Sequence, residues 1–503
     1  MSDGQEGLPE GWAWTTLDDL GLPKTTKVTP SASEDQRYEL WSVPNYPHGP
    51  EILEGSEIGS SKQIVGPGDV LLCKINPRIN RVEVVGEPGN LPQIASTEWV
   101  VVRSDGATLP AYLRHAFSEA SFRRELNKDV SGVGGSLIRA RPQAIRKLIV
   151  PVAPENEQRR IVAKIESLGA RSEAAKEALD AIPPLLEKFR QSVLAAAFRG
   201  DLTAAWRAKN PDVEPASVLA LQQHQLPDEY QRLRKIRNKG TVTLPDDAFP
   251  DLPTTWCYRS VNQLYDSGII LDYADGNHGS LYPRKAEFGP SGVTFVTATQ
   301  IDERGRIDLA GAPLLNSEKA HQLKKGWARG GDVLLTHNAT VGRTARVPDD
   351  AGNFLLGTSA TFYRTQSDVL DPDYLYFALT APSWQRQLRS IMEQTTRNQV
   401  SIQKQAFFGI PFAPFGEQRA IVALLKRAFA WADAMEDSLT AALSNAASLN
   451  QSILAKAFRG ELVPQDPTDE PASVLLERIR AEREAAEAAK KASKKNKRRG
   501  ATA

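Results

Sequence analysis

The chain has 503 residues, with 62 lysines and arginines against 61 aspartates and glutamates, which gives a formal net charge of +1. This length predicts about three or four domains, and a composition of 41% hydrophobic and 24% charged residues is typical of soluble globular proteins. Two cysteines, Cys73 and Cys257, exclude a disulfide framework and a zinc cluster and favour a reducing, cytoplasmic compartment. The polar N-terminus is unlike a signal peptide, and no apolar run is long enough to predict a membrane span. Balanced charge argues at first against nucleic-acid binding, because nucleic-acid-binding domains are usually basic.

The first part of the chain predicts a mixed α/β domain. Val70–Ile75 is a short β-branched run after a Gly-Asp turn, and Glu98–Arg103 is a similar run, so both predict strands. Pro110–Leu126 predicts a helix, because proline is favoured in a first helical turn. A long helix is expected over Ile165–Val193, and the polar, turn-rich segment Thr203–Asp251 predicts a connector.

The same order of elements returns in the second half. Val333–Thr336 and Ala360–Arg364 predict strands, and Asp373–Ile391 predicts a helix. A second long helix is expected over Leu425–Ile453. After Ala481 the Ala/Glu/Lys-rich composition predicts a frayed helix and then disorder.

Five sequence motifs occur twice in the same order, so the chain is a tandem duplication. Pro151–Leu202 and Pro411–Leu462 have the same length, whereas the segments before them differ in length and sequence. Each copy therefore has a variable globular front half and a rear half of fixed length. The paired motifs are LPEGW and LPTTW (ending at Trp12 and Trp256), GDVLL (from Gly68 and Gly331), PVAPENEQRRIV and PFAPFGEQRAIV (from Pro151 and Pro411), QSVLAAAFRGDL and QSILAKAFRGEL (from Gln191 and Gln451), and EPASVL (from Glu214 and Glu470).

The two long helices carry apolar residues at alternating spacings of three and four, which indicates a coiled-coil seam. Matching length and register favour packing of the two helices on each other, although each could instead pack on its own globular domain. Pro183 and Pro184 predict a kink or a break near Ile182, because proline lacks an N–H and clashes with the preceding turn. At about 1.5 Å per residue, each seam would span a length comparable to one turn of B-DNA.

No motif in the sequence predicts catalysis. A methyltransferase would need a glycine-rich cofactor loop and an Asn/Asp-Pro-Pro-aromatic motif, and Asp371–Tyr374 lacks the second proline. No lysine stands two residues after an acidic residue, as in common restriction nucleases, and there is no GxxxxGK[ST] phosphate loop. Gly132–Gly135 is more typical of a flexible loop, and the scattered histidines give no metal-ligand pair.

Basic and amide-bearing side chains gather around both GDVLL strands, mostly directly after them. Arginine and lysine suit phosphates and the guanine edge, and asparagine suits the adenine edge. An ordinary solvated turn is an equally good interpretation for any one of these residues, and for His337 a structural role is favoured. The shared location in both copies nevertheless predicts DNA contact for the groups. The candidates are Lys62, Lys74, Asn76, Arg78, Asn80 and Arg81 in the first copy, and Lys324, Lys325, His337, Asn338, Thr340, Arg343 and Arg346 in the second.

A second set of candidates lies in the motifs of the rear halves. Gln158 and Gln418 follow a Pro-x-x-Pro frame at the start of each long helix, where the neighbouring glutamates suit the helix dipole. Helix capping and contact with a partner protein both remain open for this motif. The candidate partner-binding residues are Gln158, Arg159, Phe198, Arg199, Gln418, Arg419, Phe458 and Arg459.

These motifs resemble the specificity subunits of type I restriction–modification systems over nearly the whole chain. The strongest carriers are the Pro-x-x-Pro…Glu-Gln-Arg segments at Pro151–Arg159 and Pro411–Arg419, and AFRG(D/E)L at Ala197–Leu202 and Ala457–Leu462. The resemblance implies an α/β (α+β) fold with two globular target-recognition domains. It also implies that two long helices pair as an antiparallel coiled coil and act as a spacer. Pro183–Pro184 departs from a straight spacer helix.

The resemblance further implies a non-catalytic subunit that reads the two halves of a bipartite, asymmetric DNA target. It implies two adenine-N6 methyltransferase subunits that use S-adenosylmethionine, and further restriction/translocase subunits that use ATP and Mg²⁺, with no cofactor on this chain. A helical scaffold that never contacts DNA is the alternative from another class. The expected domains are a first recognition domain (1–150), a first helical region (151–202), a connector (203–251), a second recognition domain (252–410), a second helical region (411–462) and a C-terminal helix with a basic tail (463–503).

The net charge hides a segregation of charge along the chain. Lys490–Arg499 carries seven basic and no acidic residues, so the remainder of the chain has a net charge of −6. Phosphate contacts supply much of the affinity of DNA-binding proteins, and this chain has few basic residues in excess. We therefore expect sequence specificity from this chain and much of the phosphate contact from its methyltransferase partners.

Overall fold

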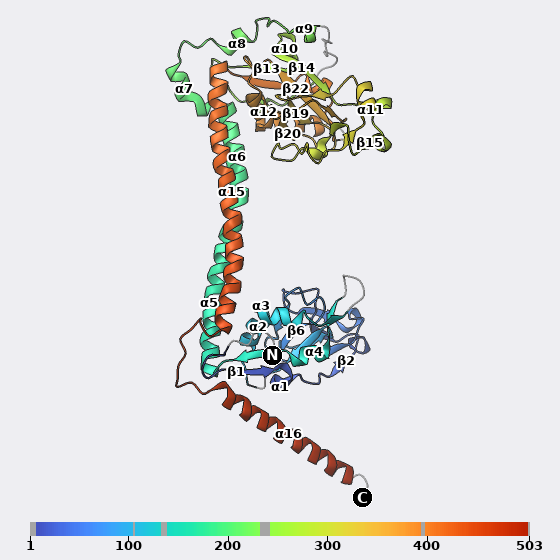
Figure 1. The fold of residues 1–503 in the computed structure, drawn as a ribbon, viewed down its shortest axis with the longest axis vertical. Helices are drawn as coiled ribbons and strands as arrows, with labels where there is room; N and C mark the ends of the chain where they lie inside the picture. The colour runs from blue at the N-terminus through green and yellow to red at the C-terminus, as the bar shows by residue number, and fades with distance from the viewer. Residues whose placement is uncertain (1–6, 104–105, 132–137, 232–241, 394–397, 501–503) are drawn as a thin grey trace. The chain divides into compact units, whose positions relative to one another are not determined.

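The computed structural model describes residues 7–103, 106–131, 138–231, 242–393 and 398–500. The chain forms two compact units, shown in Figure 1. The first unit consists of Met1–Asp180 together with Leu439–Ala503, and the second of Ala181–Ser438. The first unit therefore contains both the start and the end of the chain, whereas the second is continuous in sequence. The glycine-rich segment 132–135 lies outside the described residues.

The first unit has a mixed globular part built on two sheets and two small ribbons. In the larger sheet β3 and β8 are parallel, and its other pairs are antiparallel. The five-stranded sheet has the order β2 (Lys27–Val28), β5 (Lys62–Ile64), β8 (Gln93–Ser96), β3 (Arg37–Trp41), β4 (Glu51–Glu54). The three-stranded sheet has the order β7 (Val82–Val84), β6 (Val70–Cys73), β9 (Trp99–Val102), and the ribbons pair β1 (Ala13–Thr16) with β12 (Ile149–Val152) and β10 (Val130–Ser131) with β11 (Arg139–Ala140).

The second unit repeats this plan with different strand lengths. Strands β6 and β19 begin at the two GDVLL motifs and are buried at every residue, which fits their unbroken apolar sequence. A four-stranded sheet has the order β14 (Ile270–Asp275), β22 (Ala360–Thr365), β19 (Val333–Thr336), β20 (Thr344–Arg346). A five-stranded sheet has the order β15 (Phe288–Gly289), β17 (Leu314–Leu315), β16 (Val293–Val296), β21 (Phe354–Leu356), β18 (Trp327–Ala328), and β13 (Cys257–Ser260) pairs with β23 (Gly409–Phe412).

The helices lie at the predicted positions, but two of the predicted helices are each split into two shorter helices. The expected helix Pro110–Leu126 is interrupted at Glu119, whose extended backbone ends one helix while its carboxylate caps the next. The expected helix Asp373–Ile391 is interrupted at Ala381, whose backbone is also extended and which directly precedes Pro382. The globular helices are α1 (Leu17–Gly21), α2 (Pro110–Ser118), α3 (Ala120–Leu126), α4 (Pro142–Lys147), α7 (Ala204–Lys209), α8 (Ala216–Leu219), α9 (Asp228–Gln231), α10 (Val261–Asp266), α11 (Ser317–Gln322), α12 (Pro372–Thr380), α13 (Pro382–Glu393) and α14 (Ile402–Gln405).

The first long helix is broken where the two prolines predicted it. Helix α5 (Glu155–Asp180) ends one residue before α6 (Ile182–Phe198), which has proline in its first turn. The second long helix, α15 (Phe415–Phe458), is continuous, and its two ends belong to different units. Helix α16 runs over Ala472–Gly500, whereas disorder was expected for the end of the basic tail. Among the described residues no helix is both long and apolar enough to cross a membrane.

Within each unit the long helices pair antiparallel, but the predicted seam is only partly buried. In the second unit Phe189 of α6 contacts Trp431 of α15 at 5.3 Å, and Arg190 pairs with Asp433 at 2.6 Å. In the first unit the start of α5 shares a buried cluster with the last turns of α15. The expected seam residues Met435 and Leu449 are 37% and 54% exposed. The heptad pattern therefore predicted the helices and their pairing better than the burial of each position.

A buried ion pair holds each GDVLL turn to its sheet. Asp69 is fully buried and accepts two hydrogen bonds from Arg103, at 2.7 and 2.6 Å. Asp332 occupies the equivalent place in the second unit and accepts two from Arg364, at 2.8 and 2.7 Å. Because each carboxylate also accepts a backbone N–H from its own turn, the turn, the strand and the arginine form one rigid frame in both units.

The EPASVL motif of each copy packs on the globular part of the other copy. In the first unit the N–H of Ala472, at the start of α16, donates to the carbonyl of Gly11 at 2.8 Å. In the second unit the N–H of Ala216, at the start of α8, donates to Thr255 at 2.9 Å. Gly11 and Thr255 each precede the tryptophan of the LPxxW motif. Each unit therefore contains the same contact, in which the front half of one copy binds the EPASVL motif of the other copy.

The AFRG motifs are exchanged in the same way. Phe198, from the first copy, packs against Tyr374 of the second unit with ring centroids 5.2 Å apart. Phe458, from the second copy, packs against Tyr112 of the first unit at the same distance. Each AFRG motif thus packs in a core that also contains residues from the front half of the other copy.

The start of α16 is part of the first unit's core, so its truncation should destabilise that unit. Leu475 and Ile479 are 5% and 7% exposed and pack in the same cluster as β6 and α2. Leu475→Ala and Ile479→Ala should each lower the free energy of unfolding by about 2–5 kcal/mol. Val474→Ala, on the exposed side of the same helix, should change it by less than ~0.5 kcal/mol. Denaturant unfolding of the three variants measures the difference, and equal losses would show that α16 is not packed.

Candidate functional site

Two β-hairpin loops occupy equivalent places in the two units. The first loop, residues 74–81, joins β6 to β7, and the second loop, residues 337–343, joins β19 to β20. Both follow directly from a GDVLL strand, and the buried ion pair of that motif lies at the opposite end of the strand. They contain most of the residues for which the sequence predicted DNA contact.

The same backbone contacts fix both loops. The N–H of Asn76 donates to the carbonyl of Ile138 at 2.7 Å, and the N–H of Ala339 donates to the carbonyl of Asn398 at 3.0 Å. The residue before each also forms an isolated antiparallel bridge, with Arg139 in the first unit and Gln399 in the second. The loops therefore have a common scaffold although their side chains differ.

Each loop contains a residue in the left-handed backbone region at the same position. Asn76 has φ 45° and Ala339 has φ 63°, and they are the non-glycine residues with positive φ among the described residues. For alanine this conformation costs about 1–2 kcal/mol. Strained backbone of this kind persists where the surroundings enforce it, and it is concentrated at functional sites.

A side chain from a neighbouring helix donates a hydrogen bond to the main chain of each loop. Arg123 of α3 donates to the carbonyl of Pro77 in the first loop. Gln385 of α13, its counterpart in the second repeat, donates to the carbonyl of Gly342 at 2.9 Å. Because Arg123 and Gln385 bind main-chain carbonyls, they can fix the position of a loop whatever side chains the loop carries.

The two loop tips present different side chains. Arg78, Ile79 and Asn80 are exposed in the first loop, and Ile79 has 48% of its surface exposed. In the second loop Ala339 is exposed, and Thr340 and Val341 are half-buried. One tip therefore offers a cation, an amide and an aliphatic group, whereas the other offers a hydroxyl and small aliphatic groups. The predicted DNA contacts did not include Ile79, Ala339 or Val341, because these side chains carry no charge or amide.

Several predicted DNA-contacting residues are engaged inside the protein. Lys62 is 8% exposed, donates to Ser60 Oγ at 2.6 Å, and burial lowers the pKa of its ammonium group. His337 is 4% exposed and hydrogen-bonded to Thr361, and burial lowers the pKa of its imidazole. Lys74 donates to the carbonyl of Thr97 at 2.7 Å. These geometries favour structural roles for the three, as the sequence analysis already favoured for His337.

The remaining candidates differ in their availability. Lys324 and Lys325 are exposed, while Asn338 and Arg81 are half-buried beside the loop tips. Arg343 donates to the carbonyl of Ile301 at 3.0 Å, and Arg346 pairs with Asp349 at 2.7 Å. Both arginines would have to exchange these contacts to bind a phosphate or a base.

The Glu-Gln motifs at the start of the long helices are buried and form hydrogen bonds to neighbouring segments of the same unit. Gln158 is fully buried, accepts the N–H of Leu109 at 2.9 Å and donates to the carbonyl of Ala153 at 2.8 Å. Gln418 is also fully buried and makes the equivalent bonds to Asp371 and Ala413, at 3.0 and 2.8 Å. The structure thus favours the framework role over direct partner contact for both amides.

The preceding glutamates serve the same framework. Glu157 accepts the indole N–H of Trp12 at 3.0 Å, and Glu417 accepts that of Trp256 at 2.8 Å. Burial raises the pKa of Glu157. These bonds join the LPxxW motif to the long helix in each unit, which explains the joint recurrence of the two motifs.

The other predicted partner-binding residues divide into buried rings and exposed arginines. Phe198 and Phe458 are 1% and 9% exposed and pack in the cores described above. The arginines are exposed at equivalent positions of the two units: Arg159 and Arg459 in the first, and Arg419 and Arg199 in the second. Arg199 and Arg459 each pair with an acidic residue two positions later.

Together these features define a class of protein with two related globular modules. Its two units share one scaffold, differ at the tips of equivalent loops, and are built on paired helices. Within the described ranges no group of three or more His, Cys, Asp or Glu side chains could hold a metal ion.

Comparison with known proteins shows which proteins the chain is similar to. The chain is 29% identical over 363 residues to the specificity subunit of the type I restriction enzyme EcoBI of Escherichia coli, covering 70% of this chain and 68% of that subunit. It is 26% identical over 517 residues to the StySPI specificity subunit of Salmonella potsdam, covering 97% and 98%. The crystal structure of the HsdS subunit from Thermoanaerobacter tengcongensis matches with a TM-score of 0.57 and 21% identity, covering 92% of this chain and 100% of that one. No protein-family model matches the chain.

The predicted family resemblance is confirmed: the chain is a relative of the type I restriction enzyme specificity subunits. The predicted fold class is confirmed by the structural match along most of the chain. The relatives are specificity subunits rather than catalytic ones, which supports a role in DNA sequence recognition. The roles of individual residues stay predictions.

Proposed function

We propose that the chain reads a bipartite, asymmetric DNA target, with the first loop contacting one half-site and the second loop the other. The observation that carries this proposal is the common scaffold of the two loops, with equivalent backbone bonds at Asn76 and Ala339 and different side chains at the tips. A shared scaffold would give both loops the same approach to DNA. Different tips would then give each half-site its own sequence.

The chemistry of the tips suggests what each loop reads. In the first loop Arg78 suits the O6 and N7 atoms of guanine, Asn80 suits adenine, and Ile79 can contact a thymine methyl group. In the second loop Thr340 can donate to a base, and Val341 offers another aliphatic contact. We therefore expect the first half-site to depend more on hydrogen bonds to purines, and the second more on apolar contacts.

The long helices would set the separation of the half-sites and bind two adenine-N6 methyltransferase subunits. Exposed apolar side chains on the helix pair of the second unit support partner binding: Leu185, Trp431 and Met435 are 62%, 53% and 37% exposed. Large apolar groups left exposed are common at interaction sites. S-adenosylmethionine would be bound by the methyltransferase subunits, and ATP and Mg²⁺ by restriction/translocase subunits where these join.

Exchange of the front domain tests this function. Replacing residues 1–150 by the front domain of another specificity subunit should change one half of the methylated target and leave the other half and the spacing intact. Single-molecule methylation sequencing of DNA from cells that express the chain with its cognate methyltransferase reads the target directly. Exchange of residues 252–410 is the matched control and should change the opposite half. A change in both halves after either exchange, or no sequence-specific methylation with the parent chain, would contradict the proposal.

A further inference from the structure

Segment 398–400 runs antiparallel to the start of the second loop. Two main-chain hydrogen bonds, of 3.0 and 2.9 Å, join it to residues 337–339. Between these two bonds Asn338 and Gln399 face each other as an isolated antiparallel bridge. They therefore form a non-hydrogen-bonded pair, the arrangement in which the Cα atoms of facing residues are closest, about 4.5 Å apart.

The side chains of Asn338 and Gln399 lie on the outer side of this bridge. Facing residues direct their side chains to the same side of a strand pair, and successive residues alternate between its two sides. The flanking residues His337 and Val400 are 4% and 0% exposed, so their side of the pair is the buried one. Gln399 is accordingly exposed and Asn338 half-buried. The bridge thus presents two amides next to each other at the surface.

The surroundings of the two amides suit DNA. Within the described part of the chain, neither amide side chain takes part in a hydrogen bond. Residues 337–343 and 398–404 contain no aspartate or glutamate, and each segment contains one arginine or lysine. A surface with amides and cations and without carboxylates can approach the phosphate backbone and place hydrogen-bonding groups against base edges.

The first unit contains the same bridge with different side chains. Ile75 faces Arg139 there, and two main-chain bonds of 2.7 and 2.9 Å flank the pair. The guanidinium of Arg139 donates to both carboxylate oxygens of Glu98, at distances between 3.0 and 3.2 Å. Ile75 packs against a hydrophobic core. In the first unit the bridge therefore makes framework contacts, whereas in the second unit its amides are directed to the surface.

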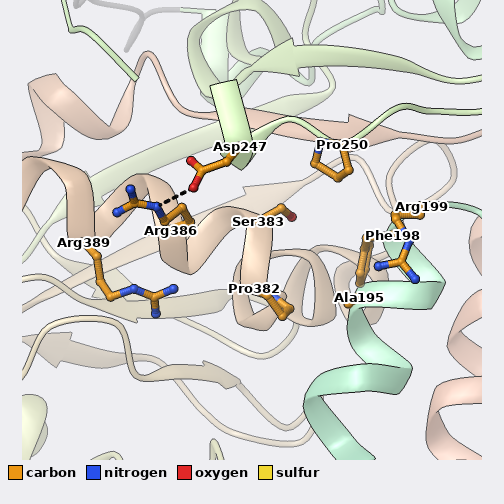
Figure 2. Close-up of a pocket in the computed structure, with 9 residues that line it drawn as sticks. All are labelled: Ala195, Phe198, Arg199, Asp247, Pro250, Pro382, Ser383, Arg386 and Arg389. Carbon is orange, nitrogen blue, oxygen red and sulfur yellow. Dashed lines mark hydrogen bonds and ion pairs between the residues drawn. The ribbon is translucent and has the colours of Figure 1, made fainter. Parts of the chain in front are cut away.

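The cleft at the end of α6, shown in Figure 2, differs from the bridge in this respect. Its Arg386 donates to Asp247 at 3.2 Å, and its Arg199 pairs with Asp201 at 2.8 Å. Phe198, which also lines the cleft, is 1% exposed. Most of its charged groups are therefore already paired within the protein, so the bridge offers a ligand more hydrogen-bonding capacity.

We propose that Gln399, together with Asn338, reads adenine in the second DNA half-site. This rests on the proposed function, in which the second loop contacts that half-site. The amide of glutamine or asparagine accepts a hydrogen bond from N6 of adenine and donates one to N7, which distinguishes adenine from the other bases. The Cβ atoms of facing residues are about 4.5–5.5 Å apart and successive nucleotides about 3.4 Å apart along one strand, so the pair spans two adjacent bases.

The amide pair adds to the contacts of the loop tip. The tip alone makes the second half-site the more apolar of the two, and the bridge places hydrogen-bonded adenine positions beside those apolar contacts. Gln399 was not among the predicted DNA contacts, because it is far from the GDVLL strand in sequence and reaches the loop through the bridge.

The first test is methylation sequencing of DNA from cells that express full-length variants with the cognate methyltransferase. Gln399→Ala should relax one adenine position of the second half-site and lower methylation of the parent target about tenfold. Gln399→Glu keeps the shape of the side chain but cannot donate to N7, so the same adenine preference should be lost. Gln403→Ala is the matched control, because it removes an exposed glutamine from the same segment, and it should keep the parent target.

The second test identifies the contacted atom with 7-deazaadenine, which lacks the N7 acceptor. The base is placed in turn at each adenine of the second half-site, and binding of the chain in complex with its methyltransferase is measured. At one position it should weaken binding of the parent complex about threefold or more. At that position it should weaken the Gln399→Ala complex no further, because the contact to N7 is already absent.

The outcomes separate the amide contact from the function on which it rests. If the parent chain directs methylation of a bipartite target and both Gln399 variants keep that target and its rate, the adenine proposal is overturned while the proposed function stands. A uniform loss of methylation without a change in base preference, a change confined to the first half-site, or an equal effect of 7-deazaadenine on parent and variant also overturns it. If the parent chain gives no sequence-specific methylation, both proposals fail.

Discussion

Grafting residues 339–343 in place of residues 76–81 should change the first half of the DNA target and leave the second half unchanged. The graft keeps the left-handed position at its start, and the backbone bond to Ile138 should therefore be kept. It removes Arg78 and Asn80, whose bidentate base contacts would each be worth roughly 1–3 kcal/mol of discrimination. Methylation of the parent target should accordingly fall about tenfold or more for each lost contact.

Methylation sequencing measures the outcome in the same cells as the parent chain. A control graft in the exposed segment 86–90, which precedes β8, should leave both halves of the target as they were. An unchanged first half-site would show that the first loop does not read DNA. A changed second half-site would show that the loops are not independent.

Asp332→Ala should lower the free energy of unfolding of the second unit by about 3–5 kcal/mol, because it leaves Arg364 as an uncompensated, largely buried cation. The side chain of Asp332 is 1% exposed and that of Arg364 is 13% exposed. Asp349→Ala removes an ion pair in which the aspartate side chain is 82% exposed, so it should cost less than ~1 kcal/mol. Denaturant unfolding followed by tryptophan fluorescence distinguishes the two variants.

A double variant, Asp332→Leu with Arg364→Met, tests the physical cause. If the unpaired charge is responsible for the loss, the double variant should be more stable than Asp332→Ala alone, because apolar replacements of a buried ion pair are often tolerated. Equal instability of the two would instead point to the lost backbone hydrogen bond of the turn, between Arg329 and Asp332.

The architecture could be predicted from the sequence because the duplication repeats local motifs. Gly-Asp before an apolar run located β6 and β19, and Pro183 located the break between α5 and α6. The helix breaks at Glu119 and Ala381 were missed, although Ala381 directly precedes Pro382, a signal for the end of a helix. Glu119 has no proline or glycine beside it. Glu119 ends α2 by capping the next helix with its own side chain, a local choice that apolar periodicity does not reveal.

The assignment of individual site residues was less predictable, because it depends on contacts between distant segments. Gln158 and Gln418 resemble exposed helix-start residues in sequence, yet the front domains bury them completely. Lys62 was grouped with exposed cations, although its strand places it at a buried position. The equivalence of Asn76 and Ala339 is invisible in their side chains, since it lies in the backbone and in the bonds to Ile138 and Asn398.

The exchange of motifs between the repeats has a consequence for the order in which the protein folds on the ribosome. Domains generally fold during synthesis in the order in which they emerge. Here the second unit, Ala181–Ser438, is continuous and can complete its core as soon as its last residue emerges. The first unit needs Leu475 and Ile479 for its core, so the segment that is synthesised first is the one completed last. Until translation reaches α16, the nascent chain exposes the surface that this helix will cover.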